Sequence, residues 1–209
     1  MQFRRRALAV VAFAAAMGYL EAACVVYLQR AIGMTPAQLF PVRDASTLNG
    51  LAGAELAREV ATLVMLWGIG WLAGSTGLQR FAWTAVAFGV WDIVYYMGLV
   101  ALIGWPTSLG AWDLLFMIPA PWAGPVWAPL LVSVALIGFG LAYARRDDLQ
   151  LRSIEWAALV LGGAIVVLAF CWNATLVLDK GVPTTFPVAL YAVGMTIGCA
   201  AAIRPLRRH

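Results

Sequence analysis

The sequence predicts an all-α integral membrane protein built as a bundle of six transmembrane helices. Three observations support this prediction: 63% of the 209 residues are hydrophobic, only 11% are charged, and six stretches are long enough to cross a bilayer. An ordinary soluble domain carries roughly 25% charged residues. No long polar stretch remains for a separate soluble domain, so we expect a single membrane domain over residues 1–209.

Each predicted helix is a run of about 20 mostly apolar residues, the length that crosses a hydrocarbon layer of about 30 Å. In chain order, the runs cover residues 7–28, 52–74, 81–104, 126–144, 154–178 and 183–203. The first run follows a basic start, as in a signal peptide. It continues past Glu21 to Leu28, however, which favours an uncleaved first helix.

The positions of the basic residues predict the orientation of the bundle, because cytoplasmic loops carry an excess of Lys and Arg. Ten basic residues fall on one side of the predicted helices, namely Arg4, Arg5, Arg6, Arg80, Arg145, Arg146, Arg152, Arg204, Arg207 and Arg208. Four fall on or near the other side, namely Arg30, Arg43, Arg58 and Lys180. We therefore expect a multi-pass membrane protein with both termini in the cytoplasm. This asymmetry explains the net charge of +4 without nucleic acid as a partner.

Three acidic residues are predicted to lie inside the membrane. Glu21, Glu59 and Asp92 interrupt the first three runs, and the apolar pieces beside them are too short to cross a bilayer alone. With helices of alternating direction, Glu21 and Glu59 lie in the outer half of the bilayer and Asp92 lies near its middle. Arg58 and Asn173 fall at about the same level.

These polar groups are expected to face one another or water, because an unpaired charge in lipid costs about 2.5–3.5 kcal/mol on insertion scales. The sequence therefore predicts a polar pocket in the outer half of the bundle. Tyr95 and Tyr96 follow Asp92 by three and four residues, so their phenols are expected to hydrogen-bond its carboxylate. Two structural alternatives stay open: hydrogen bonds between helices for Asp92 and Glu21, and acids at a helix N-terminus for Glu55 and Glu59.

The loop of residues 104–130 contains no basic residue but five of the ten prolines and four of the ten tryptophans. Pro119, Pro121, Pro125 and Pro129 disfavour helix, and non-helical backbone at membrane depth needs cover from protein or a water-filled cavity. We expect an interfacial or re-entrant lid over the outer pocket. The pair Trp112-Asp113 repeats Trp91-Asp92, and these residues join Trp122 in the predicted ligand-binding set. The alternative is a belt of tryptophans anchored at the lipid headgroups.

Several kinds of chemistry lack the residues they need. The only histidine is His209, which leaves bis-histidine haem, His-ligated zinc and Ser-His-Asp catalysis without an internal candidate. No lysine lies inside a predicted helix, and the sequence has neither a Walker loop nor a Rossmann fingerprint. We therefore predict no cofactor and no transition-metal site. Oxygen-ligated cations and protons are compatible with the composition.

The motifs GYLEA, REVATL, WDIVYY, GWPTSL, WDLLF and PAPW, which lie between residues 18 and 122, are similar to those of a family of small bacterial polytopic inner-membrane proteins. That resemblance implies a multi-pass protein of the bacterial inner membrane but no particular activity. The chain is also loosely similar to polytopic terpene cyclases of the meroterpenoid type. In such enzymes an embedded carboxyl group protonates an isoprenoid and aromatic faces stabilise the carbocation. This chain departs from them in having no acid in its last helix.

Three functions remain open from the sequence. The first is a carboxylate- and aromatic-lined pocket that binds or moves a small cation, a proton or an amphipathic, lipid-like molecule. The second is an enzyme acting on a lipid or isoprenoid, with Asp92 or Glu21 as the catalytic acid. The third is a non-catalytic subunit that packs against a membrane-protein partner or another copy of itself through small residues such as Gly162 and Gly194.

Overall fold

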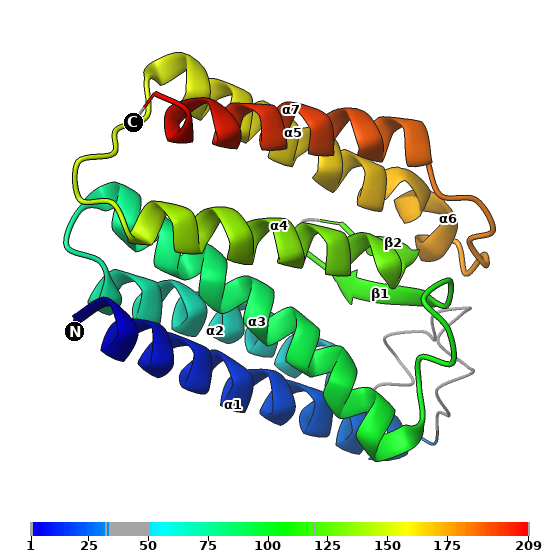
Figure 1. Ribbon diagram of the computed structural model, residues 1–209. Helices are drawn as coiled ribbons and strands as arrows, with labels where there is room; N and C mark the ends of the chain where they lie inside the picture. Colours follow the sequence, from blue (N-terminus) through cyan, green and yellow to red (C-terminus); the bar gives the residue numbers. More distant parts are fainter. Residues whose placement is uncertain (1, 32, 34–50, 119, 209) are drawn as a thin grey trace.

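The computed structural model describes residues 2–31, 33, 51–118 and 120–208, and Figure 1 shows it as a bundle of long helices. Six of its helical segments are long and apolar enough to cross a membrane, so the chain is a multi-pass membrane protein by length and composition. Arg43 and Pro119, used in the sequence predictions, lie outside the described residues.

The helices match the predicted runs, with shifts at their ends. They are α1 (Gln2–Ala31), α2 (Leu51–Ala73), α3 (Gly77–Ile103), α4 (Trp127–Ala144), α5 (Ser153–Phe170), α6 (Ala174–Leu178) and α7 (Val188–Leu206). The fifth predicted run is divided, because a short 3-10 turn (Cys171–Asn173) separates α5 from α6. The last helix begins at Val188 instead of Pro183, directly after Pro187, which cannot donate a main-chain hydrogen bond.

Local sequence explains where α3 begins and ends. The Thr76 side chain accepts a hydrogen bond from the backbone N–H of Gln79 at 3.2 Å, which satisfies one of the free donors at the helix start. Gly104 adopts a left-handed conformation with φ of 67° directly after the last turn. A glycine carries no Cβ and takes this conformation without steric cost, so it terminates the helix cleanly.

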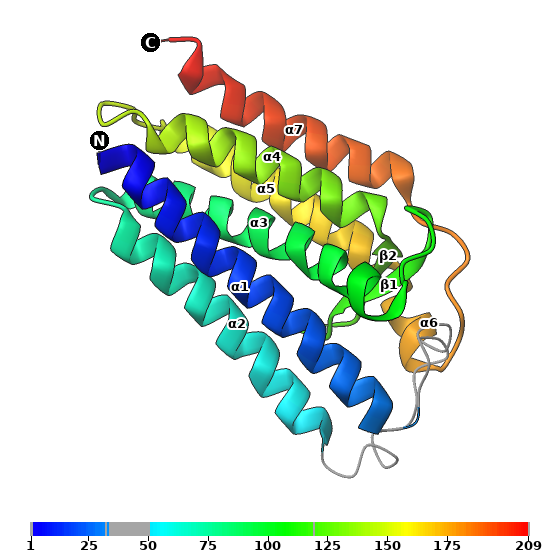
Figure 2. The same cartoon turned by 60° about the horizontal axis from the view of Figure 1, so that its bottom comes forward.

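α3 is the central helix of the bundle. It packs against α1, α2 and α4, whereas α5 packs mainly against α7. In Figure 2 the helices run alongside one another, with α2 at one edge of the molecule and α7 at the other. The protein thus consists of a four-helix group, α1 to α4, and a two-helix group, α5 and α7.

Two tyrosines join the two groups. The Tyr143 hydroxyl at the end of α4 donates to the backbone oxygen of Ala202 in α7 at 2.8 Å. The Tyr191 hydroxyl near the start of α7 donates to the backbone oxygen of Ala128 in α4 at 2.7 Å. Because α4 and α7 make few other contacts, these two bonds fix their spacing at both ends.

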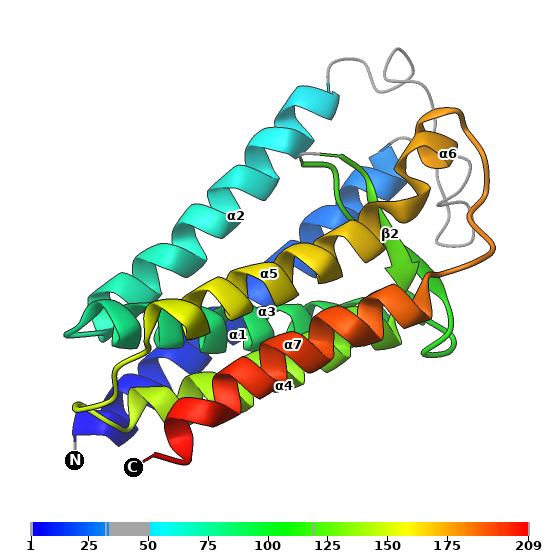
Figure 3. The same cartoon turned by 90° about the horizontal axis from the view of Figure 1, so that it is seen from above.

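The proline-rich loop forms a short antiparallel hairpin, so the structure differs here from the predicted all-α fold. Strands β1 (Trp112–Phe116) and β2 (Trp122–Pro125) pair with Asp113 opposite Gly124 and with an irregularity after Leu114. The hairpin and α6 lie at the end of the bundle opposite the two termini (Figures 1 and 3). We call these the hairpin end and the terminal end.

Candidate functional site

The predicted acid in α1 is buried in an ion-pair network with α2. Glu21 is 8% exposed and pairs with Arg58, which also pairs with Glu55 one turn earlier in its own helix. The Thr62 hydroxyl donates to Glu21 Oε2 at 3.0 Å. These contacts neutralise Glu21 within the bundle and tie α1 to α2.

Glu59 connects α2 to the hairpin. Its carboxylate is 5% exposed, and both oxygens accept from the backbone N–H of Met117, each at 3.1 Å. Met117 follows β1 directly, at the point where the strand ends and its main-chain groups lose their strand partners. Glu59 therefore satisfies a main-chain donor that the hairpin itself leaves unpaired.

Asp92 faces α4, which corrects the prediction that Tyr95 and Tyr96 bind it. Asp92 is 4% exposed, and its Oδ2 accepts from the hydroxyl of the fully buried Ser133 at 2.8 Å. The Tyr96 hydroxyl instead donates to Oδ2 of Asp113 in β1 at 2.9 Å. Tyr96 thus bonds the carboxylate of the hairpin, because that group and not Asp92 lies next to its phenol.

Asp113 is a buried carboxylate of the hairpin, 2% exposed. Burial raises the pKa of Asp113 to about 6, because the charged form loses its hydration. Hydrogen bonds from the Tyr96 hydroxyl and from the backbone N–H of Leu114, at 2.8 Å, act in the opposite direction.

Three of the predicted charged residues, Arg58, Asp92 and Asp113, lie within electrostatic range of the Tyr95 phenol, as does Glu55. Glu21 and Glu59 make the separate contacts described above. Asn173 joins none of these groups, because its amide donates to the backbone oxygen of Thr185 at 2.9 Å, between the 3-10 turn and the segment before α7.

The predicted tryptophans pack against other aromatic rings. Trp91 stacks on Tyr95 with ring centres 6.2 Å apart, and Trp122 stacks on Phe170 at 6.1 Å. Trp112 meets Phe186 edge to face at 6.4 Å. The stack of Trp122 on Phe170 places β2 against the end of α5, so the hairpin touches both helix groups.

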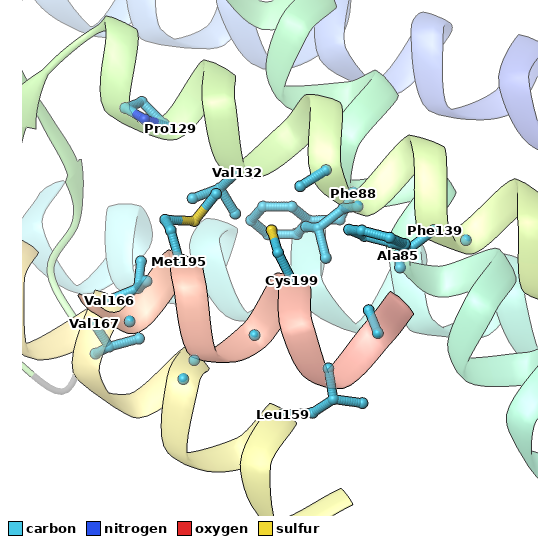
Figure 4. Close-up of a pocket in the computed structure, with 18 of the residues that line it drawn as sticks. Ala85, Phe88, Pro129, Val132, Phe139, Leu159, Val166, Val167, Met195 and Cys199 are labelled. Atoms are coloured by element: carbon cyan, nitrogen blue, oxygen red, sulfur yellow. The ribbon is translucent and has the colours of Figure 1, made fainter. Parts of the chain in front are cut away.

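A cavity of about 340 Å³ lies between the two helix groups. Its walls come from α3, α4, α5 and α7, and the hairpin closes one end with Leu115, Phe116 and Trp122. Figure 4 shows how Phe88 and Val132 from the first group face Met195 and Cys199 of α7 across it.

The cavity is elongated and almost entirely apolar. Its lining extends along α3 from Phe81 to Asp92, about 16 Å at about 1.5 Å per residue. Asp92, at the hairpin end, is the one charged side chain among the described residues that line it. Phe81 of α3 and Gly163 of α5 line the cavity and are themselves exposed, so its wall includes residues at the surface of the protein.

Glycines make room for this cavity. Five of them line it, namely Gly140, Gly162, Gly163, Gly194 and Gly198. Gly162 and Gly194 also allow α5 and α7 to approach closely, because a Cβ on either would lie 2.8 Å from the other's backbone oxygen. These glycines therefore make their contact within the chain, whereas the third function predicted from the sequence places them against a partner.

The sequence predictions included Asp92 and Trp122, which line the cavity, but neither Ser133 nor the apolar side chains of the cavity wall. One signal was present for Ser133: it is the only hydroxyl-bearing residue in the first two thirds of α4, an otherwise apolar helix. A hydroxyl at such a position often bonds a polar group of a neighbouring helix. The cavity had no comparable signal, because its lining consists of ordinary apolar residues and glycines.

Within the described part of the chain, no three His, Cys, Asp or Glu side chains come together in a way that could hold a metal ion. Comparisons with protein-family models, with curated proteins and with solved structures give no match to this chain.

Proposed function

We propose that the protein binds a single-chain amphiphile of the bilayer, with its apolar chain in the cavity and its polar end at Asp92. The observation that carries this proposal is an elongated apolar cavity that ends at one buried carboxylate. This is the amphipathic ligand among the alternatives predicted from the sequence.

The size and position of the cavity support a ligand with one apolar chain. At about 340 Å³ it lies near the lower end of the range of about 300–1,000 Å³ for small-molecule sites, which suits one chain better than the two of a phospholipid. Phe81 and Gly163 line the cavity, are exposed and belong to helices that are apolar enough to span a membrane. This supports entry of the ligand from the hydrocarbon layer.

A small cation is less well supported as the ligand. Glu21 is already paired with Arg58 and Thr62, and Glu59 accepts from the Met117 N–H. A cation at these groups would have to displace contacts that hold α1, α2 and the hairpin together.

We place the protein in a bacterial inner membrane with its terminal end in the cytoplasm. The ten basic residues on the predicted cytoplasmic side belong to the chain ends and to the connections at the terminal end (Figure 1). The positive-inside bias supports this orientation. The hairpin, Asp92 and Asp113 then lie in or toward the outer half.

A second candidate function is an acid-initiated enzyme that acts on an isoprenoid. Phe88, Phe116 and Trp122 line the cavity together with Asp92, so aromatic faces lie in the same space as a proton donor. Such faces stabilise a developing carbocation. Analysis of the products formed from prenyl substrates by the parent protein and by Asp92→Asn would test this activity.

Photolabelling tests the binding proposal. Protein in phosphatidylcholine nanodiscs is irradiated with hexadecanol that carries a diazirine on its chain, and labelled peptides are mapped by mass spectrometry. We expect saturable labelling of the lining segments of α4, α5 and α7, with competition by unlabelled hexadecanol. Labelling that increases linearly with probe and lies equally on lipid-facing residues would refute the proposal.

Two leucine substitutions provide a matched pair. Gly198 lines the cavity and Gly138 does not, and a Cβ at either position meets no atom within 4 Å. Gly198→Leu should fill the cavity and abolish saturable labelling. Gly138→Leu, an equal change on an exposed face of α4, should leave it intact.

A further inference from the structure

We infer that the ligand is a long-chain alcohol: its polar end is an uncharged group that donates a hydrogen bond to Asp92. This inference rests on the proposed function, since it specifies the head of the amphiphile whose chain occupies the cavity. It favours alcohols over fatty acids, sulfonates and prenyl phosphates, whose heads are anionic.

Asp92 has one oxygen available for such a donor. Its Oδ2 accepts from the Ser133 hydroxyl, and no described residue donates to its Oδ1. The side chain is 4% exposed and lines the cavity. A buried carboxylate oxygen without a donor loses much of the stabilisation it has in water, so a ligand hydroxyl that supplies a donor is favoured.

The charges at this end of the cavity disfavour an anionic head. No Arg, Lys or His is among the described residues that line the cavity. Arg58, the arginine of the predicted site, does not line the cavity and is paired with Glu21 and Glu55. Asp113 lies close enough for its charge to act on Asp92, which makes this end more negative. An anionic ligand head placed beside the Asp92 carboxylate would be repelled, because like charges interact more strongly inside a protein than in water.

Three other side chains of the lining carry a polar atom, namely Tyr143, Cys199 and Trp122. The Tyr143 hydroxyl donates to the Ala202 oxygen at the far end of the cavity. The Trp122 indole N–H is buried without a partner among the described residues, so the lining holds an unpaired donor as well as the Asp92 acceptor. A hydroxyl is the neutral head that can accept from such a donor and still donate to Asp92, whereas an ether can only accept.

A competition series tests the head group with one constant chain. Hexadecanol, its methyl ether and hexadecanesulfonate compete with the diazirine-bearing hexadecanol in the same nanodiscs. The ether lacks the donor but stays neutral, and the sulfonate is permanently anionic. We expect the ether to be at least about tenfold weaker than the alcohol, and the sulfonate weaker still.

The Asp92→Asn variant should reduce this discrimination to within about threefold, because an amide both donates and accepts. An ether or sulfonate that displaces the probe from the parent protein as well as hexadecanol does would overturn the inference. The competition among the three compounds on the parent protein tests the inference even if Asp92→Asn does not fold. Failure of the probe to label the cavity saturably would instead overturn the proposed function itself.

Discussion

Adding one methyl group at Gly162 is expected to push α5 and α7 apart. A Cβ at this position would lie 2.7 Å from the Gly198 nitrogen and 2.8 Å from the Gly194 oxygen. Both are main-chain atoms, so neither can rotate away as a side chain would. Gly163, the next residue along α5, provides a control, because a Cβ there meets no atom within 4 Å.

The difference between Gly162→Ala and Gly163→Ala isolates the steric effect. Replacing glycine by alanine in a helix interior gains up to about 1 kcal/mol, and this gain is common to both variants. Overpacking costs about 1–3 kcal/mol and applies to Gly162 alone. For a chain of this size about 1 kcal/mol shifts the unfolding temperature by roughly 2–4 °C, so we expect Gly162→Ala to melt about 2–12 °C below Gly163→Ala.

Thermal unfolding in one detergent at one scan rate, followed by circular dichroism, measures this difference. Photolabelling with the diazirine-bearing hexadecanol adds a functional measurement, because Gly162 also lines the cavity. Equal unfolding temperatures for the two variants, or a more stable Gly162→Ala protein, would refute the close contact between the helices.

Three further changes test other contacts. Arg58→Leu leaves Glu21 buried without its partner, and we expect a loss of up to about 3–5 kcal/mol, reduced because the Arg58 side chain is 23% exposed. For Asp113, whose pKa is raised on folding to about 6, stability should fall as pH rises from about 4 to about 6, because the folded state binds more protons there. Asp113→Asn should lack this part of the pH dependence. Tyr191→Phe removes the bond to the Ala128 oxygen and should cost about 1–3 kcal/mol. Each is measured by thermal unfolding in detergent.

Each of these changes has a control. Adding Glu21→Gln to Arg58→Leu should recover part of the loss, and no recovery would contradict the ion pair. If the stability of Asp113→Asn and of the parent protein changed in parallel between pH 4 and 6, the raised pKa of Asp113 would be contradicted. Tyr19 is 53% exposed, so Tyr19→Phe should change the stability little. An equal loss of stability in Tyr19→Phe and Tyr191→Phe would show that the bond from Tyr191 to Ala128 does not account for the effect.

The six helices could be predicted because a transmembrane helix is specified by length and apolar composition alone. Their ends were less predictable where apolar residues continue beyond the helix. The last predicted run starts at Pro183, yet α7 begins only after Pro187. The hairpin was missed because its strands, WDLLF and WAGP, are short and do not alternate polar with apolar residues.

The burial of Glu21, Glu59 and Asp92 also followed from length, since their helices could not cross the bilayer without them. Their partners did not follow. Spacing along one helix placed Tyr96 beside Asp92, but the rotation of α3 against α4 directs Asp92 to Ser133. The cavity depends on how two helix groups pack, which no pattern within a single helix records.

Each of the two hydrogen bonds between α4 and α7 requires a particular side chain at one end only. Tyr143 and Tyr191 each supply a phenol that few other side chains could replace, whereas Ala128 and Ala202 contribute only carbonyl oxygens that every amino acid possesses. Homologous chains should therefore retain both phenols while the two alanine positions vary among small residues. Such chains could alter the cavity walls freely and still keep the same distance between these helices.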